Sequence, residues 1–230
     1  LLDVNESGLR WRLALADIAA HTLDLQYYTW WGDESGNILA KKVVDAADRG
    51  VKVRLIVDDL STLMMSETEP GIRDRAFSLL DAHPNIEVRV FYVWRQRTLA
   101  GRTLEALVRM ERLNHRMHNK LFIADTRATI IGGRNIGNDY FGLAKELNFR
   151  DLDVLGIGPV ARQASVVFDQ FWNSGWVTPL VRLSDPVKLA DLRREQAGMR
   201  RELVAADALL RFSVNQKDRD GDIKAVISTM

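Results

Sequence analysis

The sequence predicts an α/β protein with parallel strands in a sheet that helices cover on both faces. A strand-like segment at 23–30, an amphipathic segment at 38–50 and an apolar, β-branched segment at 51–59 follow one another. The same order recurs at 75–94, where RAFSLLDAHP precedes NIEVRVFYVW. Such successions form crossover units with parallel strands. Because 47% of the 230 residues are hydrophobic, the chain can also bury a sizeable core.

The elements of the first half have recognisable boundaries. Leucine and isoleucine recur on one face over 8–20, which predicts the first helix. The aromatic segment 23–30 alternates in part and ends at the turn residues GDESGN, as a strand would. The helix predicted over 38–50 ends at Gly50, a glycine of the kind that follows helix C-termini.

The segment after residue 94 is predicted to extend the same sheet. Residues 95–115 are polar and basic, which indicates a loop and a helix over the sheet edge or the site. Strands are expected at 128–133 and 150–157, with a short helix between them near Asp139 to Glu146. A helix from Pro159 to Trp176 should close the core. Its predicted core face consists of Val160, Ala164, Val167, Phe168, Phe171, Trp172 and Trp176.

Composition narrows the class of protein. The formal net charge is +1, so nothing in the total favours nucleic acid or an acidic partner. The chain has no cysteine, which excludes disulfides and thiolate metal sites. It has no run of about eighteen apolar residues, so we expect a soluble or peripheral chain. It begins without Met and ends in the apolar run KAVISTM, which favours a piece of a longer protein.

The clearest chemistry lies in RMHNKLFIADTRATIIGGRN, residues 116–135. If Met117 to Ala124 forms a strand, its two-residue period places His118 and Lys120 on one face. A turn at Asp125 to Arg127 and a return strand would then complete a hairpin. Its glycines would let backbone amides approach a bound group closely.

An imidazole, an ammonium, glycine amides and the side chain of Asn135 together suit a tetrahedral oxyanion such as a phosphate. The lysine and the amides would neutralise charge on the non-bridging oxygens, and neutral imidazole is a nucleophile near neutral pH. The predicted chemistry is phosphoryl or phosphatidyl transfer through a phosphohistidine. The sequence has no glycine-rich nucleotide loop, so the phosphate is expected in an ester.

This segment resembles the signature of the phospholipase D superfamily, H-x-K-x4-D-x6-G-[SG]-x-N. The flanking segments LDLQYYTWWGDESG, AADRGVKVRLIVDD, NHRMHNK, IGGRNIGNDYF and RDLDVLGIGP are similar to the bacterial cardiolipin synthase branch, so the resemblance covers 8–178. It implies a phospholipase D-like αβα sandwich with a mixed, largely parallel sheet. The positions that match the signature are His118, Lys120, Asp125, Gly132, Gly133 and Asn135.

The resemblance implies roles for the matching residues. His118 corresponds to the nucleophile that forms a covalent phosphatidyl-histidine. Lys120 and Asn135 correspond to residues that bind phosphate oxygens. Asp125 corresponds to the aspartate of the motif, whose role is mainly architectural. Gly133 occupies a position that is often serine, so a hydroxyl is missing there and only the amide remains for the phosphate.

The resemblance further implies that an acidic residue after the motif orients the histidine by accepting a hydrogen bond from its second ring nitrogen. Asp151 fits this role best, Asp153 is the alternative, and Glu146 is a third choice. The resemblance implies that no metal and no other cofactor is needed.

The resemblance also implies two such motifs in each active site, but the sequence contains one. The other histidines, His21, His83 and His115, lack a lysine at the required spacing. Either two chains pair their motifs across a twofold axis, or the chain is the first half of a tandem protein, which we favour. We therefore expect a catalytic half-domain at 1–178, followed at 179–230 by a connecting helix and the start of a second half.

Several other residues allow two interpretations. Asp58 and Asp59 end a strand, where α/β sites gather, but they could equally cap a helix or pair with arginine.

The alternating strand before them contains Gln26, Tyr27 and Tyr28, which could line the site, although a core position is favoured. His115 is expected to be a structural or rim residue. KDRDGD near residue 220 is expected to be a solvated turn, because it lacks the downstream glutamate of a calcium loop.

The expected activity is that of a cardiolipin synthase-like phosphatidyltransferase. It would act on a phospholipid, with phosphatidylglycerol favoured, at a peripheral position on the cytoplasmic side of a bacterial inner membrane. The alternatives are a phospholipase D hydrolase, a homodimeric nuclease of the same superfamily and a non-catalytic lipid-binding half. The near-zero net charge disfavours a polyanionic substrate.

Overall fold

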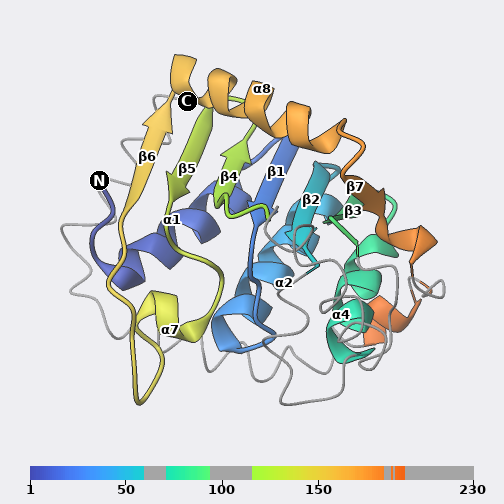
Figure 1. The fold of residues 1–230 in the computed structure, drawn as a ribbon, viewed down its shortest axis with the longest axis horizontal. Helices are drawn as coiled ribbons and strands as arrows, with labels where there is room; N and C mark the ends of the chain where they lie inside the picture. The colour runs from blue at the N-terminus through green and yellow to red at the C-terminus, as the bar shows by residue number, and fades with distance from the viewer. Residues whose placement is uncertain (60–70, 94–115, 184–187, 189, 195–230) are drawn as a thin grey trace, which may run out of the picture.

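The computed structural model describes residues 1–59, 71–93, 116–183, 188 and 190–194, with the backbone alone for 71–75. The described strands form one seven-stranded sheet in the order β6-β5-β4-β1-β2-β3-β7 (Figure 1). Their bounds are β1 Thr22–Tyr27, β2 Lys52–Asp58, β3 Ile86–Phe91, β4 Leu121–Ala124, β5 Ala128–Gly132, β6 Asp153–Ile157 and β7 Val177–Pro179.

The sheet is mixed. Strands β1, β2 and β3 pair in parallel, as the two crossover units predict. Strands β4, β5 and β6 add on the other side of β1 in antiparallel pairs, and β7 pairs antiparallel with β3. The α/β class and the mixed sheet are therefore confirmed. The prediction of a largely parallel sheet is wrong, because among the seven strands parallel pairing is confined to the three joined by helical crossovers.

Helices cover both faces of the sheet. On one face, α1 and α2 share a core with the inward side chains of β1 and β2, and Phe77 and Leu80 of α4 join the same core. On the other face, α8 buries Ala164, Phe168 and Trp172 against a second apolar cluster (Figure 1). The helical bounds are α1 Asn5–Ile18, α2 Glu34–Asp48, α4 Gly71–Asp81, α7 Asn138–Phe141, α8 Pro159–Trp172 and the 3-10 turn η1 Leu180–Arg182.

Helix α2 begins four residues before the predicted start at 38. The side chain of Asp33 accepts a hydrogen bond from Gly36 N at 3.0 Å, which satisfies one of the first free N–H groups of the helix. Part of the predicted turn GDESGN is therefore the first turn of the helix. At the other end Gly50 has φ +98°, a left-handed conformation that favours glycine, as predicted.

Helix α8 differs from its predicted extent and orientation. It ends at Trp172 and not at Trp176. Its buried stripe is rotated from the predicted one, so Val160 and Val167 are 40% and 41% exposed. Valines flank the buried stripe on both sides, so the apolar periodicity alone fits more than one rotation of the helix. The buried residues are Ala161, Ala164, Ser165, Phe168 and Trp172.

The predicted boundary at residue 178 falls within β7, which is hydrogen-bonded to β3. Beyond it, Leu180 and Leu192 are buried in the core that α1 and α2 share with the sheet. The division into 1–178 and 179–230 stays a prediction, and the chain just after residue 178 still contributes to the described fold. Among the described helices, none has both the length and the apolar character required to cross a membrane.

Candidate active site

His118 and Lys120 lie together at the start of β4, but not because they share a strand. Residues 117–120 are not in a strand, and β4 begins only at Leu121. The predicted strand from Met117 is therefore wrong at its start. The buried Lys120 side chain instead turns back, and its Nζ donates a hydrogen bond to the His118 carbonyl oxygen at 2.7 Å.

Tyr28, just after β1, supports both side chains. Its ring centroid lies 5.0 Å from that of His118, with the planes tilted by 57°. Lys120 Nζ lies over the same ring, 5.4 Å from its centroid, at a distance typical of a cation–π contact. The core position favoured for Tyr28 is thus wrong, whereas Tyr27 and Gln26 are fully buried as predicted.

Asp58, at the end of β2, holds the segment that carries His118. Its carboxylate is fully buried, and it accepts hydrogen bonds from Met117 N at 3.0 Å and from Arg116 Nη1 at 3.4 Å. Of the two interpretations left open for this residue, pairing with an arginine is the one observed. Asp59 is also buried, and its backbone N–H donates to Phe91 O at 3.1 Å.

Burial and charge adjust the protonation of the site. The His118 side chain is exposed, but its partial desolvation lowers its pKa, the neighbouring Lys120 lowers it further, and Asp151 raises it in part. Burial also lowers the pKa of Lys120 to about 8, against the opposing effect of Asp151 and Asp58. At neutral pH the imidazole is therefore neutral and the ammonium is still largely charged, as a nucleophile beside an anion-binding group requires.

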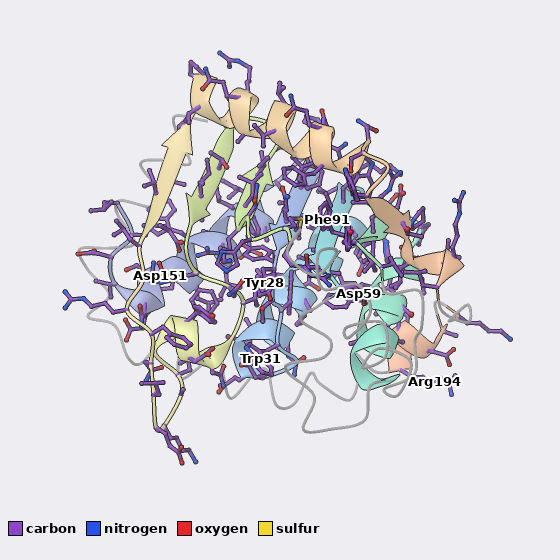
Figure 2. All side chains as sticks on the ribbon, viewed as in Figure 1. Tyr28, Trp31, Asp59, Phe91, Asp151 and Arg194 are labelled. Carbon is purple, nitrogen blue, oxygen red and sulfur yellow. The ribbon has the colours of Figure 1, made fainter. Side chains whose placement is uncertain are left out.

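Asp151 precedes β6 and lies at the candidate site. Both Asp151 and Tyr28 are found toward the lower end of the sheet in Figure 2, away from α8. Asp151 Oδ1 accepts a hydrogen bond from Leu152 N at 2.7 Å. The negative charge of Asp151 raises the pKa values of both His118 and Lys120, against the larger effect of desolvation. This position supports the predicted choice of Asp151 as the acid that orients the histidine.

Asp153, the alternative acid, is engaged elsewhere. It is fully buried between two fully buried arginines: Arg12 Nη1 lies 2.9 Å and Arg134 Nη1 3.2 Å from its Oδ2. Arg134 also donates to Leu2 O at 2.8 Å, so this cluster ties the GGRN segment to the amino-terminal residues. Glu146, the third choice, is exposed in the segment after α7. We therefore retain Asp151 as the candidate.

Asp125 lies at the opposite end of β4 from His118. Its carboxylate accepts hydrogen bonds from three successive backbone N–H groups, those of Ala20 at 2.8 Å, His21 at 2.7 Å and Thr22 at 2.8 Å. It thereby joins the hairpin turn to the connection between α1 and β1. This placement supports the architectural role that the motif implies.

Asn135 is held in one orientation by its two ends. Its Oδ1 accepts a hydrogen bond from Thr29 N at 3.1 Å, and its Nδ2 donates to the hydroxyl of Tyr140 at 2.9 Å. Tyr140, in α7, was not among the predicted site residues. The sequence offered only the segment IGNDYF as a signal, with nothing to indicate that this hydroxyl reaches the asparagine.

Gly133 contributes differently from the prediction. Its backbone N–H donates to Leu152 O at 3.1 Å, so this amide is not available to a phosphate oxygen in the structure. A Cβ at this position would lie 2.0 Å from Asp151 Oδ1. A larger residue at this position would therefore require the Asp151 side chain to move.

The other predicted features lie outside the candidate site or the described residues. His83 is buried beside Asp48, at 3.1 Å, and His21 is exposed. His115, the basic segment 95–115 and KDRDGD fall outside the described residues. Within the described part of the chain, no group of three or more histidine, aspartate or glutamate side chains could hold a metal ion.

Known proteins resemble this chain in sequence. The family model described as "Cardiolipin synthase, PLD-like domain" matches residues 13–172. Cardiolipin synthase C of Escherichia coli is 46% identical over 76% of this chain and 35% of its own length. The major cardiolipin synthase of Bacillus subtilis is 30% identical over 75% of this chain and 33% of its own length. The chain thus spans about a third of these relatives.

Solved structures show the same fold at low sequence identity. A phosphatidylserine synthase of Haemophilus influenzae superposes with a TM-score of 0.62 and 13% identity, covering 88% of this chain and 43% of that one. NucT of Helicobacter pylori gives a TM-score of 0.53 and 17% identity, covering 74% and 90%. The match to the family model and the 46% identity to cardiolipin synthase C show that the chain belongs to the cardiolipin synthase family of phospholipase D-like domains.

Proposed function

We propose that this chain carries one half of the active site of a phosphatidyltransferase. The neutral imidazole of His118 attacks the phosphorus of a phospholipid phosphodiester, the P–O bond to the leaving alcohol breaks, and a phosphatidyl-histidine forms. A second alcohol then attacks that phosphorus and releases the histidine. The observation that carries the proposal is the placement of His118 beside Lys120, which keeps an uncharged nucleophile next to a cation.

Lys120 and Asn135 are proposed to hold the phosphate. The ammonium neutralises charge on a non-bridging oxygen as the phosphorus becomes five-coordinate. Asn135 uses one Nδ2 hydrogen on Tyr140, which leaves the second for an oxygen of the substrate. The proposal needs no metal or other cofactor, because the lysine supplies the positive charge.

A second half is proposed to complete the site. Departure of the alcohol requires a general acid, and the sequence holds one His-x-Lys motif only. We place the second motif in the remainder of a longer tandem chain, because the part of this chain that matches these relatives covers only 35% and 33% of their length. Pairing of two copies is the alternative. Ile131 and Val154, paired across β5 and β6 and 41% and 50% exposed, give an apolar surface near Gly133 that supports such packing.

The substrate is proposed to be phosphatidylglycerol, both as phosphatidyl donor and as acceptor, with cardiolipin and glycerol as products. The names of the matching cardiolipin synthases support this choice. The protein would then work at a membrane surface, as a peripheral protein on the cytoplasmic side of a bacterial inner membrane.

Product analysis tests this proposal. The chain is incubated with phosphatidylglycerol vesicles, and lipids and glycerol are followed by mass spectrometry beside His118→Ala and the control His21→Ala. His21 is exposed and lies at the far end of β1 from Tyr28. Cardiolipin formed by the unmutated chain and His21→Ala, and absent with His118→Ala, is the expected result if copies can pair.

Other products would identify the alternatives. Phosphatidic acid without cardiolipin would mean that water is the acceptor and the chain is a hydrolase. Cleavage of DNA that weakens as salt rises would indicate a nuclease. Vesicle binding that survives His118→Ala, with no turnover at any protein concentration or after addition of a second half, would mean a non-catalytic lipid-binding module.

A further inference from the structure

We propose that the Tyr140 hydroxyl donates a hydrogen bond to a non-bridging oxygen of the substrate phosphate. In this way Tyr140 takes the place of the hydroxyl and the amide that position 133 does not provide. This inference rests on the proposed function, because it assumes a phosphodiester at His118.

The direction of the bond between Asn135 and Tyr140 is fixed by a third group. The backbone N–H of Thr29 can only donate, so the Asn135 atom 3.1 Å from it must be the carbonyl oxygen. The amide nitrogen therefore faces Tyr140, 2.9 Å away, and the tyrosine oxygen accepts. The hydroxyl hydrogen of Tyr140 is left to donate, and no acceptor for it is found among the described residues.

The surroundings of the hydroxyl place it on the phosphate side of the site. Asn135, which donates to this hydroxyl, also accepts a hydrogen bond from the backbone N–H of Thr29. Thr29 follows Tyr28, whose ring centroid lies 5.0 Å from that of His118. These contacts connect the hydroxyl to the groups beside the nucleophile, and the Tyr140 side chain is only partly buried.

The structure also explains why another donor is needed. Gly133 has no side chain, its N–H is bonded to Leu152 O, and the Asp151 carboxylate fills the space beside it. The next backbone N–H, that of Arg134, is directed at Asp153 Oδ1 at 3.4 Å. The loop therefore offers neither of these amides to a phosphate. Among the described residues, Lys120, Asn135 and Tyr140 are donors that remain on this side of the site.

The ring of Tyr140 is held independently of its hydroxyl. It packs on Phe149 with centroids 4.9 Å apart, and the backbone N–H of Phe149 donates to Asp139 O at 2.7 Å. Tyr140→Phe thus removes the hydroxyl and keeps the ring contact. Phe149→Leu is the matched control, because it removes the ring contact and keeps the hydroxyl.

The test is a titration of the whole chain with glycerophosphoglycerol, a soluble phosphodiester. Binding is read from the 31P signal of the ligand and from the ring signals of His118, and folding is checked by circular dichroism. Loss of a hydrogen bond to a charged group weakens binding roughly tenfold to a hundredfold. We expect that loss for Tyr140→Phe, with the His118 signals in the free protein unchanged, and about twofold or less for Phe149→Leu.

The outcomes separate the two proposals. Equal affinity of Tyr140→Phe and the unmutated chain, with the His118 signals responding in both, would overturn the role of Tyr140 and leave the proposed function standing. No response of His118 to the phosphodiester in the unmutated chain would overturn both. Equal weakening by Tyr140→Phe and Phe149→Leu would mean that Tyr140 acts by packing, which also overturns the inference.

Discussion

The carboxylate of Asp151 occupies the space into which a side chain at position 133 would extend. A Cβ at Gly133 would lie 2.0 Å from Asp151 Oδ1 and 2.5 Å from its Cγ, far inside van der Waals contact. The same relationship holds for Gly132, whose Cβ would lie 2.0 Å from Asp153 Oδ1. Each glycine of the motif therefore leaves room for one aspartate: Gly133 for Asp151 and Gly132 for Asp153.

Gly133→Ser should displace Asp151. Because Asp151 raises the pKa of His118 against the effects of burial and Lys120, its displacement should lower that pKa further. The steric overlap should also cost roughly 1–3 kcal/mol of unfolding free energy. The measurements are an NMR titration of His118 and urea denaturation. Gly175→Ser, at a glycine with open space around it, is the control and should change neither. An unaltered His118 pKa in Gly133→Ser would contradict the proposed coupling.

Asp151→Asn and Asp153→Asn should have opposite signatures. Removing the charge of Asp151 should lower the pKa of His118 and change stability by about 1 kcal/mol or less. Removing that of Asp153 leaves Arg12 and Arg134 buried without a counter-charge, which should cost roughly 3–5 kcal/mol. The His118 titration and urea denaturation of both variants check this. The reverse pattern would identify Asp153 as the acid that orients the histidine.

Binding of a phosphodiester should depend on pH with an alkaline limit near 8. Lys120, whose burial lowers its pKa to about 8, loses its charge above that value. His118 has a pKa below its ordinary value, so its neutral form prevails on the acidic side of this limit. The affinity for glycerophosphoglycerol, whose own charge is constant in this range, should therefore fall as pH rises through about 8. In Lys120→Arg the guanidinium stays charged, so the fall should disappear. If the affinity of Lys120→Arg still falls as pH rises through about 8, the titrating group is not Lys120.

Asp125→Ala should destabilise the fold without altering the protonation of the site. It removes the acceptor of three backbone N–H groups and places alanine at φ +52°, so the loss should be roughly 2–4 kcal/mol in urea denaturation. Asp125→Asn keeps one oxygen and tolerates this conformation better, so it should lose less. The pKa of His118 should not respond, because the two residues lie at opposite ends of β4. A His118 shift without a loss of stability would contradict the architectural role.

Much of the fold was predictable because its signals are local. The crossover units, the hairpin around residue 125 and the glycine after α2 follow from periodicity and turn chemistry within a few residues of each other. The rotation of α8 was not predictable, since valines flank its buried stripe on both sides. The start of α2 was missed because a capping aspartate and a turn aspartate have the same appearance in sequence.

The sequence predicted His118 and Lys120 as candidate site residues, and the structure places them side by side, but their surroundings were not predicted. Tyr28 was assigned to the core because alternation in a strand cannot reveal which aromatic lies just past the strand end. Tyr140 was missed because its position five residues after Asn135 does not by itself reveal that its hydroxyl is hydrogen-bonded to the asparagine. Asp58 was left open between two roles, and its hydrogen bond to Met117 N shows that it positions the segment before His118.

The sequence by itself determined the fold class and the residues of the motif, because both are encoded in short-range patterns and fixed spacings. Only the tertiary structure decided how these residues are arranged: that Asp153 is paired with the buried Arg12 and Arg134, that the Gly133 amide is already bonded, and that the ring of Tyr28 contacts His118. The physical reason is that burial, hydrogen-bond partners and electrostatic effects arise between residues far apart in the chain, and these depend on packing and not on spacing along the sequence.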